Sequence, residues 1–403
     1  MKVPFFRPSI GSAEIDEVVS CLRSGWLTSG PVAKRFEQEF ARAVGGAHAV
    51  AVNSCTAALH LAVEALHLKP GDAVLVPTMT FAATAEIVRY QGAVPILVDC
   101  DPLTLNLDLA DAERKLERLA AGQLAAARGQ TLRPVGIIPV HVAGVMVDIR
   151  KTQEFADRHG LWMIEDAAHA LPAAWRPTDA APWQRCGEGT SQVACYSFYA
   201  NKTITTGEGG MAVTNNADLA SRMRMMSLHG LSHDAWGRYS GGSWDYRIVA
   251  PGYKYNLTDF AAAIGVHQLA RAEEMRLARE RHAFAYRQEL AGLDAIELPI
   301  VPERRIHSWH LFPIRLRLDR LSIDRDAFIV ELKAREIGCS VHWRPLHQHP
   351  YYIDQFGWTA EDCPVASTEW RRLVSLPLFP DLLPDERRYV VDAVGEICRR
   401  HAL

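Results

Sequence analysis

The stretch SFYANKTITTGEGGM at residues 197–211 places a single lysine, Lys202, directly after an apolar run. That run, which contains Cys195, Tyr196 and Phe198, is typical of a buried strand. Burial disfavours the charged form of an ammonium group unless a partner or a chemical role compensates. Lys202 therefore either reaches solvent or acts as a nucleophile whose pKa is lowered by burial from its ordinary value of about 10.4.

Two further segments place polar groups where an apolar run ends. In LWMIEDAAHA at 161–170, the apolar run ends at Asp166, and a turn then leads to His169. In NSCTAALH at 53–60, Ser54 and Thr56 stand at the beginning of a helix. Taken one at a time, these residues are equally well explained as ordinary helix caps. A helix N-terminus with free amides and hydroxyl groups is also a phosphate site.

One cofactor, pyridoxal 5'-phosphate, explains the three signals together. Lys202 would bind its aldehyde as an imine, and Asp166 would keep its pyridine nitrogen protonated. The helix that begins near Thr56 would hold its phosphate. The sequence therefore predicts a pyridoxal phosphate site.

These residues lie at the ends of apolar segments that alternate with helical patterns. Such alternation indicates an α/β domain with a mostly parallel sheet covered on both faces. Ligands of such sheets bind beyond the carboxyl ends of the strands, where these residues lie. We expect strands at 48–53, 73–77, 94–99, 135–141, 161–166 and 193–198, with helices such as 56–66 and 149–160 between them.

The pattern changes after Asn256. A long charged helical stretch at 258–293 precedes a strand-like run at 310–318 and further helices. We therefore divide the 403 residues into a large α/β domain at 1–257 and a smaller C-terminal α+β domain at 258–403 that is entered by a long helix.

Composition excludes several classes of function. The net charge of -3, without a basic cluster, argues against nucleic-acid binding. The eight cysteines are scattered without a CxxC pair, which favours a reducing compartment. The N-terminal MKVPFFRPSIG is too short an apolar stretch for a signal peptide, and no apolar run approaches the ~18 residues of a membrane span. We expect a cytoplasmic protein without membrane or nucleic-acid partners.

Six segments, in this order along nearly the whole chain, resemble the DegT/DnrJ/EryC1/StrS family of pyridoxal-phosphate sugar aminotransferases. The resemblance implies fold type I, the aspartate aminotransferase-like fold of pyridoxal phosphate enzymes. The segments are SGWLTSGP at 24–31, NSCTAALHLA at 53–62, IEDAAHA at 164–170, SFYANKTITTGEGGM at 197–211, GYKYNLTDFAAAIG at 252–265 and VSLPLFPDL at 374–382.

The resemblance implies roles for individual residues around the cofactor. Lys202 and Asp166 would be the catalytic pair, and Phe81 would stack on the pyridine ring, although a core phenylalanine is the alternative for that position. His169 stands where the family often has glutamine near a cofactor oxygen, and Cys55 should affect only packing. The implied cofactor contacts are Ser54, Thr56, Ala57, Phe81, Asp166, His169, Ser197, Lys202 and Asn256.

Other positions resemble residues on the substrate side or at the subunit boundary. Asn256 resembles an asparagine that reaches a phosphate in the neighbouring subunit, which implies a homodimer with shared active sites. Arg238 and Arg247 could hold a donor carboxylate with two hydrogen bonds, and a plain surface loop explains them equally well. The implied substrate contacts are Trp26, Thr28, Arg238, Arg247, His310 and His342.

The expected reaction moves an amino group from an amino acid, with L-glutamate as the expected donor, to a nucleotide-linked keto-sugar. A sugar dehydratase of the same family would carry histidine in place of Lys202, and a regulatory homologue would keep the fold without turnover. A nicotinamide oxidoreductase is disfavoured because no GxGxxG follows the first strand. His342, His347 and His349 lack a cysteine or carboxylate at compatible spacing, so we expect no metal. The nucleotide, the sugar and the aminated carbon are left open.

Overall fold

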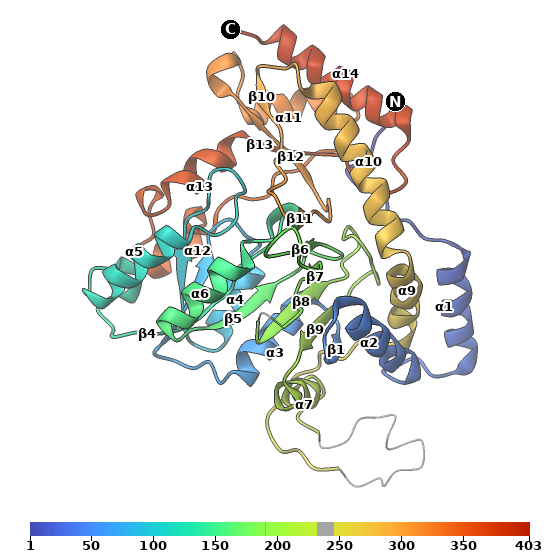
Figure 1. Ribbon diagram of the computed structural model, residues 1–403, viewed down its shortest axis with the longest axis vertical. Helices are drawn as coiled ribbons and strands as arrows, with labels where there is room; N and C mark the ends of the chain where they lie inside the picture. Colours follow the sequence, from blue (N-terminus) through green and yellow to red (C-terminus); the bar gives the residue numbers. More distant parts are fainter. Residues whose placement is uncertain (190, 232–245) are drawn as a thin grey trace.

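A seven-stranded sheet in the order β1-β9-β8-β5-β4-β2-β3 forms the centre of the larger part of the molecule (Figure 1). The computed structural model describes residues 1–189, 191–231 and 246–403, so Arg238 lies outside the described residues. The strands are β1 His48–Val52, β2 Asp72–Pro77, β3 Val94–Val98, β4 Arg133–Ile137, β5 Trp162–Asp166, β8 Val193–Ser197 and β9 Gly210–Thr214.

The central sheet is mostly parallel, and its two antiparallel pairings both involve β9. β2 pairs in parallel with β3 and β4, β4 with β5, and β5 with β8. β9 is antiparallel to both β8 and β1. The six strands expected from the apolar runs are confirmed, whereas β9 is an addition. Because an antiparallel neighbour needs no crossover helix, β8 and β9 are joined by the short segment that contains Lys202.

Both faces of this sheet are buried, as the continuous apolar runs predicted. On β8, Val193 and Cys195 join the core on one face, while Ala194 and Tyr196 join the core on the other. The surrounding helices are α1 Ser12–Ser24, α2 Pro31–Val44, α3 Cys55–Ala65, α4 Ala83–Tyr90, α5 Leu109–Ala120, α6 Ile149–His159, α7 Ala217–Met226 and α9 Asp259–Ala270. A small antiparallel sheet of β6 Ala174–Trp175, β7 Gln184–Arg185 and β11 Arg305–Ile306 lies beside them.

The C-terminal part has its own core around a three-stranded antiparallel sheet in the order β10-β12-β13. Tyr286, Phe312 and Phe328 are fully buried in it, and Val3 from the N-terminus joins them. The elements that follow α9 in the chain are α10 Ala272–Leu290, β10 Ile296–Glu297, β12 Phe312–Leu316, α11 Arg325–Ala334, α12 Pro350–Phe356, α13 Pro364–Glu369, β13 Leu373–Leu376 and α14 Pro384–Arg400. Of these, α12 packs into the core of the central sheet through Tyr352 and Phe356.

The helical stretch expected at 258–293 forms two consecutive helices, α9 and α10, with Arg271 between them. α9 packs against α1 and α2, and its Ala262 and Val266 belong to the core of the central sheet. α10 continues into the C-terminal core through Ala283 and Leu290. The domain division at residue 257 stays a prediction, and α9 and α10 form the connection between the two cores (Figure 1).

A single carboxylate holds the beginning of α2 from a distance in the sequence. Asp259, at the start of α9, is 1% exposed. Its Oδ1 accepts hydrogen bonds from the amides of Gly30 (2.7 Å) and Ala33 (2.9 Å), and its Oδ2 accepts one from Val32 (3.2 Å). The amide of Asp259 in turn donates to the carbonyl of Thr28 at 3.2 Å. A carboxylate at a helix N-terminus satisfies free amides and complements the helix dipole.

Replacing this carboxylate should destabilise the fold. We expect Asp259→Ala to lower the free energy of unfolding by about 1–3 kcal/mol, because it leaves buried amides without an acceptor. Urea unfolding followed by circular dichroism measures the change. Asp294→Ala, which removes a carboxylate from an exposed position, is the matched control and should change stability by less than ~0.5 kcal/mol. Equal effects of the two substitutions would contradict the assigned role of Asp259.

Candidate active site

Lys202 lies just beyond the carboxyl end of β8, and its amide donates to the carbonyl of Tyr199 at 2.9 Å. The side chain is partly buried. Burial lowers the pKa of Lys202 to about 8, while the nearby Cys55 and Asp166 act in the opposite direction. A lysine with this pKa provides a neutral amine near physiological pH, which is the form that reacts with carbonyl groups.

Asp166 is the last residue of β5 and is 5% exposed. Its Oδ2 accepts a hydrogen bond from the Thr84 hydroxyl at 2.8 Å, and its Oδ1 accepts one from the amide of Ala168 at 3.1 Å. The pKa of Asp166 lies above its ordinary value, because burial raises it more than these two hydrogen bonds and the charge of Lys202 lower it. Because β5 and β8 are parallel neighbours, with Asp166 opposite Cys195, the carboxylate and the Lys202 segment lie at the same edge of the sheet.

The N-terminus of α3 lies at this edge as well. Ser54 is its N-cap, and the Ser54 hydroxyl accepts a hydrogen bond from the amide of Ala57 at 3.1 Å. The start of β9 passes so close that a side chain at Gly210 would meet the Ser54 backbone at 2.4 Å. Thr56 is partly buried in the first helical turn, and Ser197 ends β8. The helix terminus predicted to bind phosphate is therefore present, although the Ala57 amide already has an acceptor.

Phe81 lies between β2 and α4 and is 65% exposed. The alternative that Phe81 is a core residue is therefore wrong. An aromatic ring with this exposure is free to cover a planar ligand. Its stacking on the cofactor stays a prediction.

Three histidines, His169, His310 and His342, lie close enough to Lys202 for its charge to lower the pKa of their rings. The ring of His169 lies 4.2 Å from that of His310 and stacks on Trp343 at 5.2 Å. The pKa values of His169 and His310 lie well below the usual range. Burial is the larger cause, and neighbouring positive charges, including that of Lys202, are the smaller one. The same causes lower the pKa of His342 to about 4, and its Nδ1 lies 2.9 Å from the Ser375 hydroxyl.

The Nδ1 atoms of His169 and His310 are buried without a hydrogen-bond partner in the part of the chain that the structure describes. Buried polar atoms of folded proteins are almost always paired, so an unpaired one near a reactive lysine points to a missing ligand. These two nitrogens are the open hydrogen-bonding positions of the histidine group.

Trp26, Thr28 and Asn256 form a second group. The Asn256 side chain donates to the Ser29 hydroxyl at 2.8 Å, and the Trp26 indole donates to the Ser29 carbonyl at 3.2 Å. Thr28 is exposed and its carbonyl binds the amide of Asp259. The structure thus connects these residues with one another through the 26–29 segment. Arg247 is exposed, and Arg238 falls outside the described residues.

Three residues of the site were not found as functional residues from the sequence. Thr84 binds Asp166, Trp343 stacks on His169, and the Cys55 thiol lies close enough to Lys202 to affect its pKa. Only a packing role was expected for Cys55. Thr80, in the PTMTF segment, and Thr84 are four residues apart, but this spacing does not indicate that Thr84 binds Asp166.

Among the described residues, one set of metal-ligand side chains gathers behind Asp166. His141 Nε2 lies 3.0 Å from Glu165 Oε2, and the Cys186 thiol donates to the same oxygen at 3.2 Å. Because His141 Nδ1 accepts a hydrogen bond from the Val147 amide at 3.2 Å, it is Nε2 that carries a proton and donates it to Glu165. A metal would need that nitrogen's lone pair, so the group is better described as a carboxylate that binds two donors.

Glu165 is thereby kept as a carboxylate in a fully buried place. Burial raises its pKa, but the hydrogen bonds and charge interaction from His141, with further donors, lower the pKa below the usual value. Of the histidines considered for zinc, His347 is buried with a hydroxyl group at each ring nitrogen, Thr78 at 2.8 Å and Ser367 at 2.8 Å.

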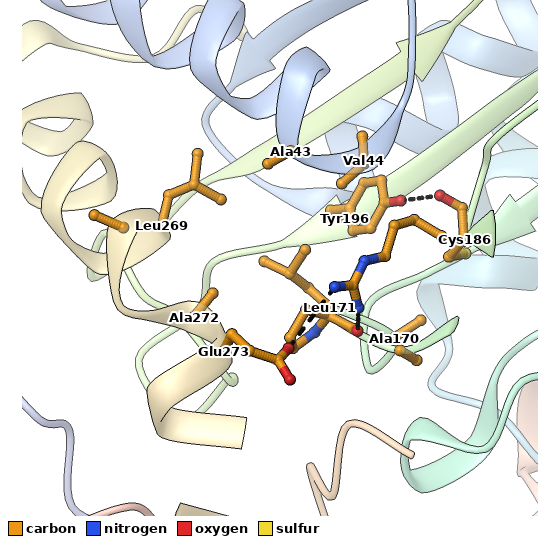
Figure 2. Close-up of a pocket in the computed structure, with 13 residues that line it drawn as sticks. Ala43, Val44, Ala170, Leu171, Cys186, Tyr196, Leu269, Ala272 and Glu273 are labelled. Atoms are coloured by element: carbon orange, nitrogen blue, oxygen red, sulfur yellow. Dashed lines mark hydrogen bonds and ion pairs between the residues drawn. The ribbon is translucent and has the colours of Figure 1, made fainter. Parts of the chain in front are cut away.

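A cavity of about 140 Å³ lies elsewhere, between the end of α2, the 170–173 turn and the junction of α9 and α10 (Figure 2). Its wall includes Cys186 and Tyr196, whose hydroxyl donates to the Cys186 carbonyl at 2.5 Å. Arg185 and Glu273 pair across it at 3.8 Å. Neither Lys202 nor Asp166 is among its lining residues, so this cavity is not the candidate active site.

The residues at the sheet edge fit pyridoxal phosphate. The donor set combines an amine with a lowered pKa, a buried carboxylate for a cationic ring nitrogen, and a helix N-terminus for a phosphate. Neither a dinucleotide nor a metal ion requires all three of these groups together.

Comparison with known proteins agrees with this chemistry. Residues 8–395 match the model of the DegT/DnrJ/EryC1/StrS aminotransferase family. The chain is 42% identical over 396 residues to the uncharacterized protein MJ1066 of Methanocaldococcus jannaschii, with 98% of this chain and 97% of that protein covered. It is 40% identical over 399 residues to the spore coat polysaccharide biosynthesis protein SpsC of Bacillus subtilis, with the same coverage of 98% and 97%.

Solved structures resemble the whole chain. DesV of S. venezuelae, solved with a ketimine intermediate, has a TM-score of 0.85 and 32% identity and covers 99% of both chains. The putative sugar aminotransferase Spr1654 of Streptococcus pneumoniae, solved in its PMP form, has a TM-score of 0.86 and 29% identity, with 99% of this chain and 98% of that chain covered. The same protein in its PLP form also has a TM-score of 0.86.

The chain belongs to the DegT/DnrJ/EryC1/StrS aminotransferase family. It is a pyridoxal-phosphate-dependent aminotransferase with the type I fold, which confirms the fold, enzyme class and cofactor expected from the sequence. None of the helices in the described part of the chain has the length and apolar character needed to cross a membrane.

The lowered pKa of Lys202 can be tested in the cofactor-free protein. We expect the reactivity of its amine toward acetic anhydride to reach half its maximum near pH 8, because burial favours the neutral amine. Competitive labelling over a pH series, read by mass spectrometry, measures the midpoint, with the exposed Lys69 as a reference for reagent reactivity. A midpoint near the ordinary lysine pKa of about 10.4 would show that Lys202 is solvated.

Proposed function

We propose that this family member transfers an amino group from an amino acid, L-glutamate in the first instance, to a nucleotide-linked keto-sugar. The observation that carries the proposal is the placement of Lys202 and Asp166 at one sheet edge beside neutral histidines with unpaired nitrogens. The names of similar proteins support a sugar as acceptor, since SpsC is a polysaccharide biosynthesis protein and Spr1654 a putative sugar aminotransferase. The product would be an amino sugar for glycan, lipopolysaccharide or secondary-metabolite synthesis.

Lys202 has two tasks in this proposal. Its Nζ would hold the cofactor covalently between turnovers. Once displaced, its neutral amine would take a proton from the donor's α-carbon and, in the second half of the reaction, deliver one to the acceptor carbon. When bound, pyridoxal phosphate supplies the carbonyl that bonds to the amino nitrogen and the cationic ring that accepts electrons. A pKa of about 8 suits an amine that must accept and release a proton near neutral pH.

Asp166 keeps the ring nitrogen protonated, and the described structure supplies the groups that hold this carboxylate. Thr84 and Ala168 each donate to one of its oxygens. Each carboxylate oxygen has a second lone pair, so both remain able to accept a hydrogen bond from a ligand.

Neutral histidines suit a hydroxyl-rich acceptor. Each neutral imidazole offers one donor and one acceptor, which matches a sugar hydroxyl group. His310 and His342 are therefore proposed as sugar contacts, with Trp26 and Thr28, and His169 as a contact to the cofactor oxygen. Arg247 and Arg238 are proposed to hold the carboxylate of the donor.

The remaining cofactor contacts and the assembly are part of the proposal. Ser54, Thr56, Ala57 and Ser197 would bind the phosphate, and Asn256 would reach it from the partner subunit of a homodimer. A cytoplasmic location is proposed because the eight cysteines are all unpaired in the structure.

The substrate proposal is tested with a panel of nucleotide-linked 3-keto and 4-keto sugars and several amino donors. We expect one amino-sugar product with glutamate, detected by mass spectrometry, and a loss of at least ~10³-fold in Lys202→Ala, because the proton-transfer group is gone. Lys202→Arg keeps the positive charge and should be equally inactive, which separates chemistry from charge. Reaction with keto acids alone would refute the sugar acceptor.

Shared active sites are tested with mixed dimers. Lys202→Ala and Asn256→Ala subunits carrying different tags are co-expressed and the mixed dimer is isolated. If Asn256 serves the partner's site, one of its two sites is intact, so activity at limiting cofactor should be ~50% of wild type per dimer. If Asn256 serves its own site, the mixed dimer should show no more than half the activity of Asn256→Ala itself.

A further inference from the structure

A pair of buried threonines lies behind the carboxylate that faces the cofactor ring. Thr84, in the first turn of α4, is 0% exposed, and Thr80, just before that helix, is 2% exposed. Their hydroxyl oxygens are 2.8 Å apart, and Thr84 Oγ1 is also 2.8 Å from Asp166 Oδ2. The three side chains therefore form one continuous hydrogen-bonded chain that ends on Asp166.

The direction of this chain follows from the number of protons. An ionised Asp166 only accepts, so Thr84 must donate its single hydroxyl proton to it. Thr84 can then only accept from Thr80, and Thr80 must be the donor. The Phe81 carbonyl, at 3.3 Å, is the competing acceptor for the Thr84 proton. The carboxylate wins because it is charged and closer.

We propose that Thr84 is a positioning residue of the aminotransferase reaction: its hydroxyl, oriented by Thr80, fixes Asp166 in the ionised form that holds the protonated ring nitrogen of pyridoxal phosphate.

Two features of the site make this contribution necessary. Asp166 is buried, and burial alone favours the neutral acid, which would not hold a cationic ring nitrogen. Only two donors are recorded on its oxygens within the described residues, the Thr84 hydroxyl on Oδ2 and the Ala168 amide on Oδ1. The Ala168 amide is a main-chain group, which no substitution at that position other than proline would remove. Thr84 is therefore the side chain whose identity affects whether Asp166 is ionised.

A merely structural role for Thr84 makes a different prediction. If its hydroxyl only stabilised the start of α4, its loss would weaken the binding of any ligand in the site by a similar factor. If it acts through Asp166, its loss should matter for ligands that present a ring nitrogen and not for a ligand that presents a carbon there.

The experiment compares pyridoxal 5'-phosphate with 1-deazapyridoxal 5'-phosphate, in which a C–H group replaces the ring nitrogen. Dissociation constants are measured by absorbance titration of the cofactor-free full-length chain. For Thr84→Val, which keeps the shape and removes the hydroxyl, we expect pyridoxal phosphate to bind about tenfold more weakly, as for the loss of one charge-assisted hydrogen bond. The deaza analogue should bind as well as before or better, because a neutral Asp166 suits a C–H group.

The decisive quantity is the ratio of the two dissociation constants. The dissociation constant of the deaza analogue divided by that of pyridoxal phosphate should fall about tenfold in Thr84→Val and stay at the wild-type value in Thr84→Ser, which retains the hydroxyl. Thr152→Val is the matched control, because Thr152 is 3% exposed and its hydroxyl donates to the Asp148 carbonyl at 2.8 Å in α6. Its ratio should not change.

Thr80→Val gives a second test if Thr84→Val does not fold. It leaves Thr84 and Asp166 intact but removes the donor that orients the Thr84 hydroxyl, so the ratio should fall by a smaller factor in the same direction. An unchanged ratio in a folded Thr84→Val or, failing that, in Thr80→Val, or an equal fall in Thr152→Val, would overturn the proposal.

Discussion

Burial at the carboxyl ends of β5 and β8 is the constraint on which the site depends. It acts on two groups with opposite requirements, since it favours the neutral form of both Lys202 and Asp166. In the proposed reaction, the lysine needs its neutral form as a nucleophile, and the aspartate needs its ionised form. The Thr84 hydroxyl and the Ala168 amide donate to Asp166 and oppose the effect of burial on its pKa.

The topology explains why these two groups meet. Parallel neighbours end at the same edge, which brings Asp166 beside β8. Because β9 is antiparallel to β8, it begins at this edge as well. A parallel strand at that position would begin at the opposite edge, so the chain would have to cross the sheet first. Lys202 is therefore held in a connection, residues 198–209, whose two ends are fixed at one edge of the sheet. β9 also brings Gly210 against the α3 N-terminus.

The sequence predicted the parts of this arrangement that depend on local pattern. Six strands were found because each contains a continuous apolar run, while β9 escaped because GMAVT follows the glycine-rich GEGG and includes its last glycine. Lys202 and Asp166 were found because a charged residue after an apolar run is chemically costly. Thr84 was not, because its bond to Asp166 joins residues 82 positions apart and has no local signature. The roles of His310 and His342 came only from family resemblance, and their unpaired or neutral state depends on burial that no single-sequence pattern reports.

The histidine group completes the electrostatic argument. His169, His310 and His342 would each add a positive charge beside Lys202 if protonated, and each such charge would make the ammonium form of Lys202 still less favourable. Burial keeps the pKa of each ring below its usual value, so the positive charge in the site is reserved for the cofactor ring and the lysine. Neutral rings can then act as combined donors and acceptors. In the proposed reaction, an acceptor without a hydroxyl group to match an unpaired imidazole nitrogen would be disfavoured. The same desolvation that lowers the pKa of Lys202 thus also keeps these rings neutral.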